Sequence, residues 1–175
     1  MSGLGAEIIA IDDTDSTGWA EGATTVGEVN FQCPDTFVNN VLSALGSRSM
    51  SLLHVQVHGS PQAVWFGSHR VDISTLETYR TKFERLTPKF LDGAWVDMRA
   101  CNVGQNLPLL HKFRRLWNVG VVAGRGTQSN LVDANLGFYQ IVTKDGREST
   151  SFSVPPWVEY SVSRRLSRSI TSRFL

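Results

Sequence analysis

The sequence predicts an α/β protein, a three-layer α/β/α sandwich with a mostly parallel central sheet. Short apolar runs rich in valine, leucine and isoleucine recur along the chain, as buried strands require. Segments with apolar residues at helical spacing lie between these runs, and strands that alternate with helices favour a parallel sheet covered on both faces. The chain has 175 residues, 41% of them hydrophobic, which is enough for one domain with a sizeable core.

The apolar runs place the strands, and turn residues bound them. We expect strands at residues 7–11, 52–57, 94–100, 119–123 and 136–142, a shorter strand at 26–31 and a small hairpin at 63–71. Side chains alternate between the two faces of a strand, so Asp97, Arg99 and Cys101 share one face. We expect an ion pair between Asp97 and Arg99. His54, on the preceding predicted strand, is expected to lie in the core.

Three helices are predicted from capping residues and apolar stripes. Asp35 caps the first helix, and Gly46 ends it. Ser74 caps the second helix, which Pro88 ends or kinks. Asn106 caps the third. Each helix carries its apolar residues on one side, so that side is expected to pack on the sheet.

The end of the chain has a different pattern. Apolar residues recur every fourth position with arginines between them: Val162, Leu166, Ile170 and Phe174. This spacing predicts a basic amphipathic helix. We therefore expect residues 1–150 to form the α/β domain and residues 151–175 to form a basic tail, docked on the domain as a helix. A partner-binding arm is the alternative role for this tail.

Composition excludes several classes of function. The net charge is +1, so nothing in the overall charge favours nucleic acid or a membrane surface as a partner. No apolar run reaches the length of a membrane span, and no secretory signal opens the chain, so we expect a cytoplasmic protein. The cysteines, Cys33 and Cys101, fit no metal-binding spacing, and we expect neither a metal nor a cofactor. Cys33 is expected to have no part in the chemistry.

A histidine and a cysteine each follow a predicted strand directly. His58 follows the run at 52–57, and Cys101 follows the run at 94–100. The carboxyl ends of parallel strands meet at one edge of a sheet, where ligands and chemistry collect. This placement predicts a cysteine nucleophile beside a histidine acid/base.

The segments around these two residues resemble the caspase-like cysteine peptidases. More narrowly, they resemble bacterial caspase-related domains of unknown function that are related to CHAT domains. Four motifs carry the resemblance: His58-Gly59-Ser60-Pro61, Phe66-Gly67, Cys101-Asn102-Val103-Gly104 and Val122-Ala123-Gly124. It covers residues 52–142, about half of the chain. Gln62 departs from the pattern, because the family often has glycine there.

The resemblance implies a caspase-like fold and a cysteine endopeptidase that cleaves a protein or peptide. Cys101 is then the nucleophile that attacks the scissile carbonyl group, and His58 is the general acid/base. The backbone N–H groups of Gly59 and Cys101 form the oxyanion hole, which stabilises the charge that develops on the carbonyl oxygen.

Two loops are candidates for the pocket that receives the residue before the cut. Asp12, Asp13 and Asp15 follow the first predicted strand and would receive arginine or lysine. Arg125 follows a later strand and would receive an acidic residue. We favour the basic residue.

Two other readings of the sequence remain as alternatives. The first is a catalytically inactive caspase-like domain that acts as a protein-interaction or assembly module, with the basic tail at 151–175 as its docking element. The second is a flavodoxin-like or nucleotide-binding protein. The sequence disfavours the second, because no glycine-rich phosphate-binding motif follows any predicted strand.

Overall fold

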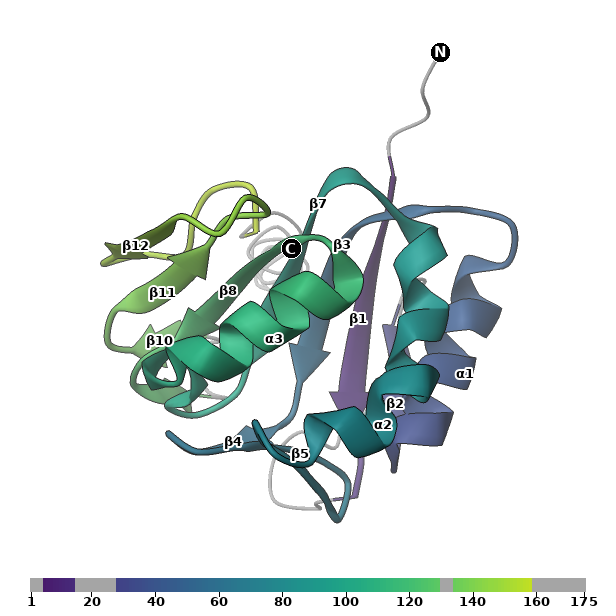
Figure 1. Ribbon diagram of the computed structural model, residues 1–175, viewed down its shortest axis with the longest axis horizontal. Helices are drawn as coiled ribbons and strands as arrows, with labels where there is room; N and C mark the ends of the chain where they lie inside the picture. The colour runs from purple at the N-terminus through teal and green to yellow at the C-terminus, as the bar shows by residue number, and fades with distance from the viewer. Residues whose placement is uncertain (1–4, 15–27, 130–133, 159–175) are drawn as a thin grey trace, which may run out of the picture.

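The computed structural model describes residues 5–14, 28–129 and 134–158, and it shows a mixed α/β fold built on one central sheet. Seven strands form this sheet: β1 (Ala6–Asp12), β2 (Glu28–Phe31), β3 (Met50–Gln56), β7 (Phe90–Arg99), β8 (Gly120–Gly124), β11 (Tyr139–Val142) and β12 (Glu148–Ser151). Their spatial order is β12-β11-β8-β7-β3-β1-β2 (Figure 1). The strands from β8 to β2 are parallel, and β11 and β12 pair antiparallel. The prediction of a mostly parallel sheet is confirmed.

The helices of the described part of the chain all cover one face of this sheet. They are α1 (Pro34–Leu45), α2 (Leu76–Phe83) and α3 (Leu107–Trp117), with short 3-10 segments η1 (Glu84–Lys89) and η2 (Val103–Gln105). In Figure 1, α2 and α3 lie in front of the sheet and α1 lies at its β2 side, and residues of all three helices belong to one core cluster. The helices between the strands were expected to cover both faces, and the described residues do not confirm a helical layer on the second face. Residues 159–175, which hold most of the predicted tail helix, lie outside the described residues. None of the described helices has the length and apolar character to span a bilayer.

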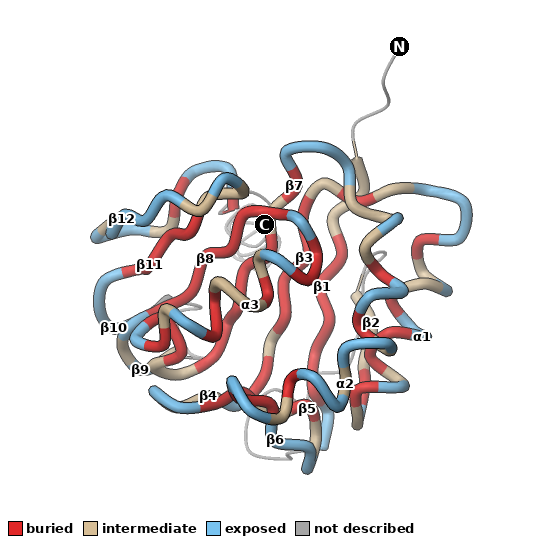
Figure 2. The backbone as a smooth tube through the Cα atoms, in the orientation of Figure 1, coloured by how far each residue is buried: buried red, intermediate tan, exposed pale blue. Residues whose placement is uncertain are grey.

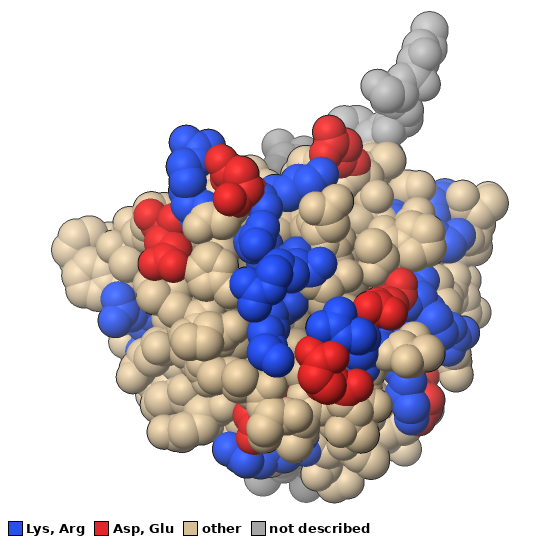
Figure 3. Space-filling model, viewed as in Figure 1, with Lys and Arg blue, Asp and Glu red and all other residues tan. Residues whose placement is uncertain are grey.

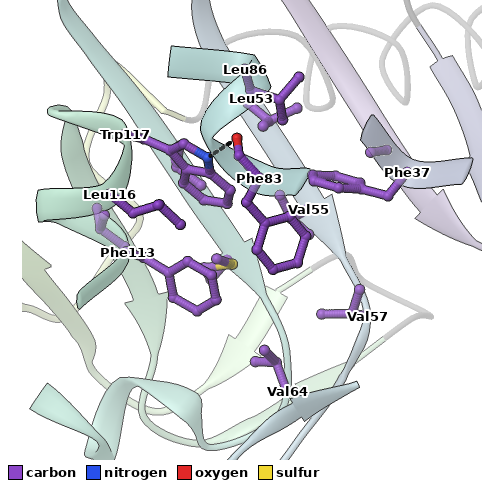
Figure 4. Close-up of a cluster of buried hydrophobic side chains, with 14 of the residues drawn as sticks. Phe37, Leu53, Val55, Val57, Val64, Phe83, Leu86, Phe113, Leu116 and Trp117 are labelled. Carbon is purple, nitrogen blue, oxygen red and sulfur yellow. Dashed lines mark hydrogen bonds between the residues drawn. The ribbon is translucent and has the colours of Figure 1, made fainter. Parts of the chain in front are cut away.

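Aromatic side chains form the centre of the core between the helices and the sheet (Figure 4). Phe83 is fully buried there, and its ring centroid lies 5.0–6.4 Å from those of Phe37, Phe66, Tyr79, Phe113 and Trp117. The indole Nε1 of Trp117 donates to the carbonyl oxygen of Phe83 at 3.0 Å, so the polar atom of this buried ring has a partner. Phe83 thus joins α1, α2, α3 and the small hairpin in one core.

The second face of the sheet carries the alternate residues of the same strands. A smaller apolar cluster lies on it: Leu52, Val122, Tyr139, Ile141 and Val158. The ring of Trp95 on β7 lies against that of Trp157, with centroids 5.7 Å apart. Gly120 on β8 makes room for this indole, since a Cβ atom there would lie 2.4 Å from the Trp95 ring. The central strands are therefore buried on both faces, as Figure 2 shows along their length.

A small three-stranded sheet follows β3, at the carboxyl end of the parallel strands. It consists of β4 (His58–Gly59), β5 (Val64–Phe66) and β6 (His69–Val71), and it confirms the predicted hairpin. Gly67 forms the turn with φ of 63°, and a Cβ atom there would lie 1.8 Å from the carbonyl oxygen of Gln32. The turn therefore requires glycine. A carboxylate oxygen of Asp12 accepts from the Gly67 N–H at 2.7 Å and fixes the hairpin to the end of β1.

Two of the predicted helix caps are wrong. The N-cap of α1 is Cys33, and Asp35 lies in the first turn. The N-cap of α2 is Thr75, and the side chain of Asp72 accepts hydrogen bonds from the N–H groups of Ser74 and Thr75. A charged carboxylate is a stronger acceptor than a serine hydroxyl, which explains why Asp72 takes this role.

The other boundaries agree better with the sequence. Gly46 ends α1 with φ of 55°, and the side chain of Asn106 caps α3, as predicted. The sequence pattern missed two features. One is β12, which forms an antiparallel hairpin with β11. The other is the antiparallel pair of β9 (Thr127–Ser129) and β10 (Ala134–Leu136). β12 reads Glu-Ser-Thr-Ser and is mostly exposed, so it lacks the apolar signal of a buried strand.

Replacing the central aromatic residue tests how far the core depends on it. Phe83→Ala should lower the free energy of unfolding by about 4 kcal/mol, because it leaves a large cavity between helices and sheet. Phe152→Ala is the matched control: this side chain is 85% exposed, and its loss should change stability by less than about 0.5 kcal/mol. Urea unfolding followed by circular dichroism measures both. Equal effects of the two substitutions would contradict the central role of Phe83.

Candidate active site

The pairing of β3 with β7 brings His58 and Cys101 to corresponding positions. The two strands run parallel, and Gln56 pairs with Arg99 at their carboxyl ends. The pairing continues one step further, since the N–H of Val57 donates to the Arg99 carbonyl oxygen at 3.2 Å. His58 and Cys101 each follow two residues after the paired Gln56 and Arg99. Both residues therefore leave the sheet at the same edge and on neighbouring strands.

Gly59 packs directly against the backbone of Cys101. A Cβ atom at Gly59 would lie 2.7 Å from the Cys101 carbonyl oxygen and 3.0 Å from its nitrogen. It would also lie 2.7 Å from the Cβ atom of Ala100. A side chain at Gly59 would thus force the two segments apart, and glycine is what allows the His58 loop to contact the Cys101 loop.

The thiol of Cys101 is partly buried and held by the loop that follows β8. The N–H of Gln128 donates to Sγ of Cys101 at 3.3 Å. The next residue, Asn102, has a left-handed backbone with φ of 61°, and its N–H donates to the Gly126 carbonyl oxygen at 2.8 Å. These contacts turn the chain sharply after the strand and orient the sulfur atom at the edge of the sheet.

His58 lies at the surface. It begins β4, where it pairs with Trp65 of β5. Its side chain is exposed, in contrast to the histidine four residues earlier, which is completely buried. His58 thus combines an exposed position with a place next to Gly59, the residue that packs on the Cys101 backbone.

The predicted acidic pocket residues have different surroundings. Asp12 is buried: one carboxylate oxygen accepts from the N–H and hydroxyl groups of Thr14, and the other from the N–H of Gly67. Its carboxylate thus holds the hairpin in place. Asp13 is exposed next to it. Asp15 lies outside the described residues.

Arg125 lies in the loop that contacts Cys101. Its side chain is exposed, and its carbonyl oxygen accepts from Nε2 of Gln105 at 2.8 Å. The same Nε2 atom donates to the side-chain oxygen of Asn102 at 3.3 Å. Gln105 therefore links the loop after Cys101 to the loop of Arg125.

Buried charges form a second group on the same two strands. His54 pairs with Asp97 in the β-sheet register, and its Nδ1 lies 2.8 Å from the Asp97 carboxylate. Its Nε2 lies 2.9 Å from the carboxylate of Glu7 on β1. Arg99 donates from Nε to Asp97 at 2.8 Å, which confirms the predicted ion pair. The contacts of His54 with Asp97 and Glu7 were not predicted, because they depend on the cross-strand register.

The charge of this buried group follows from its contacts. Burial alone would lower the pKa of His54, but the hydrogen bonds to Asp97 and Glu7 outweigh burial and raise the pKa above its usual value of 6.5. Burial alone would raise the pKa of Asp97, but Arg99 and His54 hold it below its usual value of 3.8. Between about pH 3.8 and pH 6.5, the two usual values, these shifts favour a protonated His54 beside a charged Asp97.

Lysine and arginine side chains form a band over the helical face, across α3 (Figure 3). The helix contributes Lys112, Arg114 and Arg115 to this band. Part of this charge is compensated locally, because Nζ of Lys112 lies 3.5 Å from Glu77 and Arg114 donates to the carbonyl oxygen of Lys144. The band lies on the helices, away from the edge that carries Cys101.

Cys33, which the sequence pattern sets aside, has a distinctive environment. It is the N-cap of α1, and its Sγ lies 3.4 Å from the Thr36 hydroxyl oxygen. The hydrogen bond with Thr36 lowers the pKa of the Cys33 thiol below its usual value of 9.0. The thiol is half-buried. Cys33 thus has a feature that favours reaction with electrophiles.

No group of three or more histidine, cysteine and acidic side chains within 5–14, 28–129 and 134–158 is arranged to hold a metal ion. No protein-family model matches this sequence, and no curated protein sequence matches it. The site is therefore interpreted from its own geometry.

The buried charged group should give this protein a defined pH dependence of stability. The raised pKa of His54 means that its contribution is complete below about pH 6.5 and is lost as the pH rises through its folded pKa. The lowered pKa of Asp97 means that its contribution is present above about pH 3.8 and is lost as the pH falls through its folded pKa. The group should stabilise the fold most between these two values.

His54→Gln tests this pH dependence. It should lower the free energy of unfolding at pH 6 by about 3 kcal/mol, because it removes the imidazolium from between two carboxylates and leaves buried Asp97 with Arg99 alone, and by less as the pH rises. Urea unfolding from pH 5 to pH 9 measures the difference. His69→Gln, at an exposed histidine, is the control and should follow the wild-type curve. A difference between His54→Gln and wild type that does not change with pH would contradict the raised pKa.

The Cys33 thiol should react with iodoacetamide at neutral pH. Thr36→Val removes the hydroxyl group that lowers the Cys33 pKa, and it should slow the reaction about fivefold, the equivalent of a hydrogen bond worth about 1 kcal/mol. Mass spectrometry of the labelled peptide in a Cys101→Ala background measures the rate. Thr78→Val, at an exposed threonine on α2, is the control. Equal rates for all three proteins would show that Thr36 has no influence on the thiol.

Proposed function

We propose that this chain is a caspase-like cysteine endopeptidase with a three-layer α/β/α fold, in which Cys101 and His58 form the catalytic dyad. One observation carries the proposal: His58 and Cys101 follow paired positions of neighbouring parallel strands. The contact of Gly59 with the Cys101 backbone supports it. A reducing, cytoplasmic setting fits the proposal, because the nucleophile must remain a free thiol.

The proposed reaction has two halves. In the first, the Cys101 thiolate attacks the scissile carbonyl carbon, and a C–S bond forms while the carbonyl oxygen becomes an oxyanion. The N–H groups of Gly59 and Cys101 donate to that oxyanion. The C–N bond then breaks, and protonated His58 gives its proton to the leaving amine. The product of this half is a thioester on Cys101 and a free amino terminus.

In the second half, water hydrolyses the thioester. His58, now neutral, takes a proton from the water as it attacks the thioester carbonyl carbon. The C–S bond breaks, a carboxylic acid leaves, and the Cys101 thiolate and protonated His58 are restored. The reaction consumes one water and requires neither a redox partner nor a cofactor.

The residue before the cut has two candidate partners in this proposal. A basic residue would be received by the acidic loop, and the exposed position of Asp13 supports this choice. The carboxylate of Asp12 is less suited, because it already accepts from Thr14 and Gly67. An acidic residue would be received by Arg125, whose loop contacts Cys101 through Gln128.

Cleavage of a fluorogenic peptide pool, varied at the residue before the cut, tests the proposal. Cys101→Ala should lower the cleavage rate at least about a thousandfold, and His58→Ala should do the same, because the two groups act as a unit. Cys33→Ser is the matched control and should keep full activity. A preference for arginine or lysine would indicate the acidic loop, and a preference for aspartate or glutamate would indicate Arg125.

Thiol reactivity must be read together with turnover, because Cys33 is also expected to react. Cleavage that survives Cys101→Ala would contradict the proposal. Absence of cleavage, with a Cys101 that labels no faster than an ordinary thiol in the Cys33→Ser background, would favour the alternative of a non-catalytic caspase-like interaction module.

A further inference from the structure

A cleft of about 400 Å³ opens beside the proposed dyad. Its walls come from three segments that are far apart in the sequence. Pro61 and Gln62 follow the His58 loop, Ile73 precedes α2, and Gln105 and Pro108 lie at the junction of η2 and α3, a few residues after Cys101. Two of these segments thus follow His58 and Cys101 by only three to seven residues.

The polar groups of the cleft are already engaged within the chain. The Asp72 carboxylate accepts from the N–H and hydroxyl groups of Ser74 and lies 2.6 Å from the guanidinium of Arg70. Asn106 accepts from the Leu109 N–H with its side-chain oxygen. The charge of Asp72 and the side-chain oxygen of Asn106 therefore already have partners within the chain. The cleft offers an incoming group few polar atoms that need a partner.

Most of the surface that remains open in the cleft is apolar, although Gln62, Ser74 and Gln105 are also exposed there. Ile73 is 41% exposed, although it is a large aliphatic residue, and Pro61 and Pro108 are exposed on the other two walls. An apolar side chain that covered these atoms would remove them from water, which is favourable in proportion to the area buried. A charged side chain would lose hydration and find no free opposite charge in return.

The walls of the cleft are held together by specific contacts. Nδ2 of Asn106 donates to the Gln62 carbonyl oxygen at 3.1 Å and ties the start of α3 to the His58 loop. The Ser60 hydroxyl accepts from the N–H groups of Gln62 and Ala63, which fixes the turn after His58. The cleft is thus formed before any ligand arrives, and binding does not require its walls to be ordered.

We infer that this cleft is a specificity subsite that receives an uncharged, apolar side chain of the polypeptide near the bond that is cut. The inference rests on the proposed function, because it names part of the substrate of that same site. It assigns Ile73 as a specificity-determining residue that contacts the substrate side chain and takes no part in the chemistry.

Cut-site mapping tests the inference. The full chain is incubated with a peptide pool randomised on both sides of the cut, and mass spectrometry identifies the cleaved bonds. Wild type should prefer leucine, isoleucine, valine or methionine over glutamate and lysine at one position near the bond by about tenfold. Ile73→Lys should abolish that preference and favour glutamate there. Leu91→Lys is the matched control, since Leu91 is 38% exposed on β7, outside the cleft, and its profile should equal wild type.

The possible outcomes distinguish failure of the subsite from failure of the proposed peptidase activity. Absence of any cleavage that depends on Cys101 would overturn both. Cleavage that depends on Cys101, but with a profile that is the same in wild type and Ile73→Lys, would overturn the subsite alone. An equal change of profile in Leu91→Lys would also overturn it, because a general effect of added charge would then explain the result.

Discussion

The parallel pairing of β3 with β7 is the constraint on which the candidate site depends. It fixes Gln56 opposite Arg99, and the two chains leave the sheet together from that point. Gly59 can then contact the Cys101 backbone, and the cleft walls at Gln62 and Asn106 can meet through a hydrogen bond. Neither dyad residue makes this arrangement itself. The register of β3 and β7 determines where the two loops begin and therefore how they meet.

The buried charges on the second face help to specify that register. His54 lies directly opposite Asp97, and their hydrogen bond crosses the strand pair that carries the site. A slip of one residue would place His54 opposite an apolar neighbour and turn every side chain of the strand to the other face. It would also break the hydrogen bond of His54 with buried Asp97, which would then keep only Arg99 of its own strand. This contact therefore helps to fix the geometry of the candidate site.

Sequence patterns identified the features that depend on local chemistry. The apolar runs located the central strands, and alternation along β7 placed Asp97 and Arg99 on one face, where they pair. Features that depend on tertiary contacts could not be predicted from these local patterns. The capping role of Asp72 requires knowledge of where α2 starts, and the partners of His54 require the register of three strands. The edge strand β12 was not recognised because its exposed polar residues carry no periodic apolar signal.

Under the proposed function, the comparison of Cys33 with Cys101 distinguishes a reactive thiol from a catalytic one. Cys33 has a lowered pKa because of Thr36 at the start of α1, an arrangement that many helices can provide. In the proposal, Cys101 has a histidine on the neighbouring strand end, a glycine that lets the two loops touch and an adjacent cleft. A thiolate alone can be alkylated, but turnover also requires a proton for the leaving amine and donors for the oxyanion. Substrate cleavage, and not thiol labelling, is therefore the property that distinguishes the two cysteines.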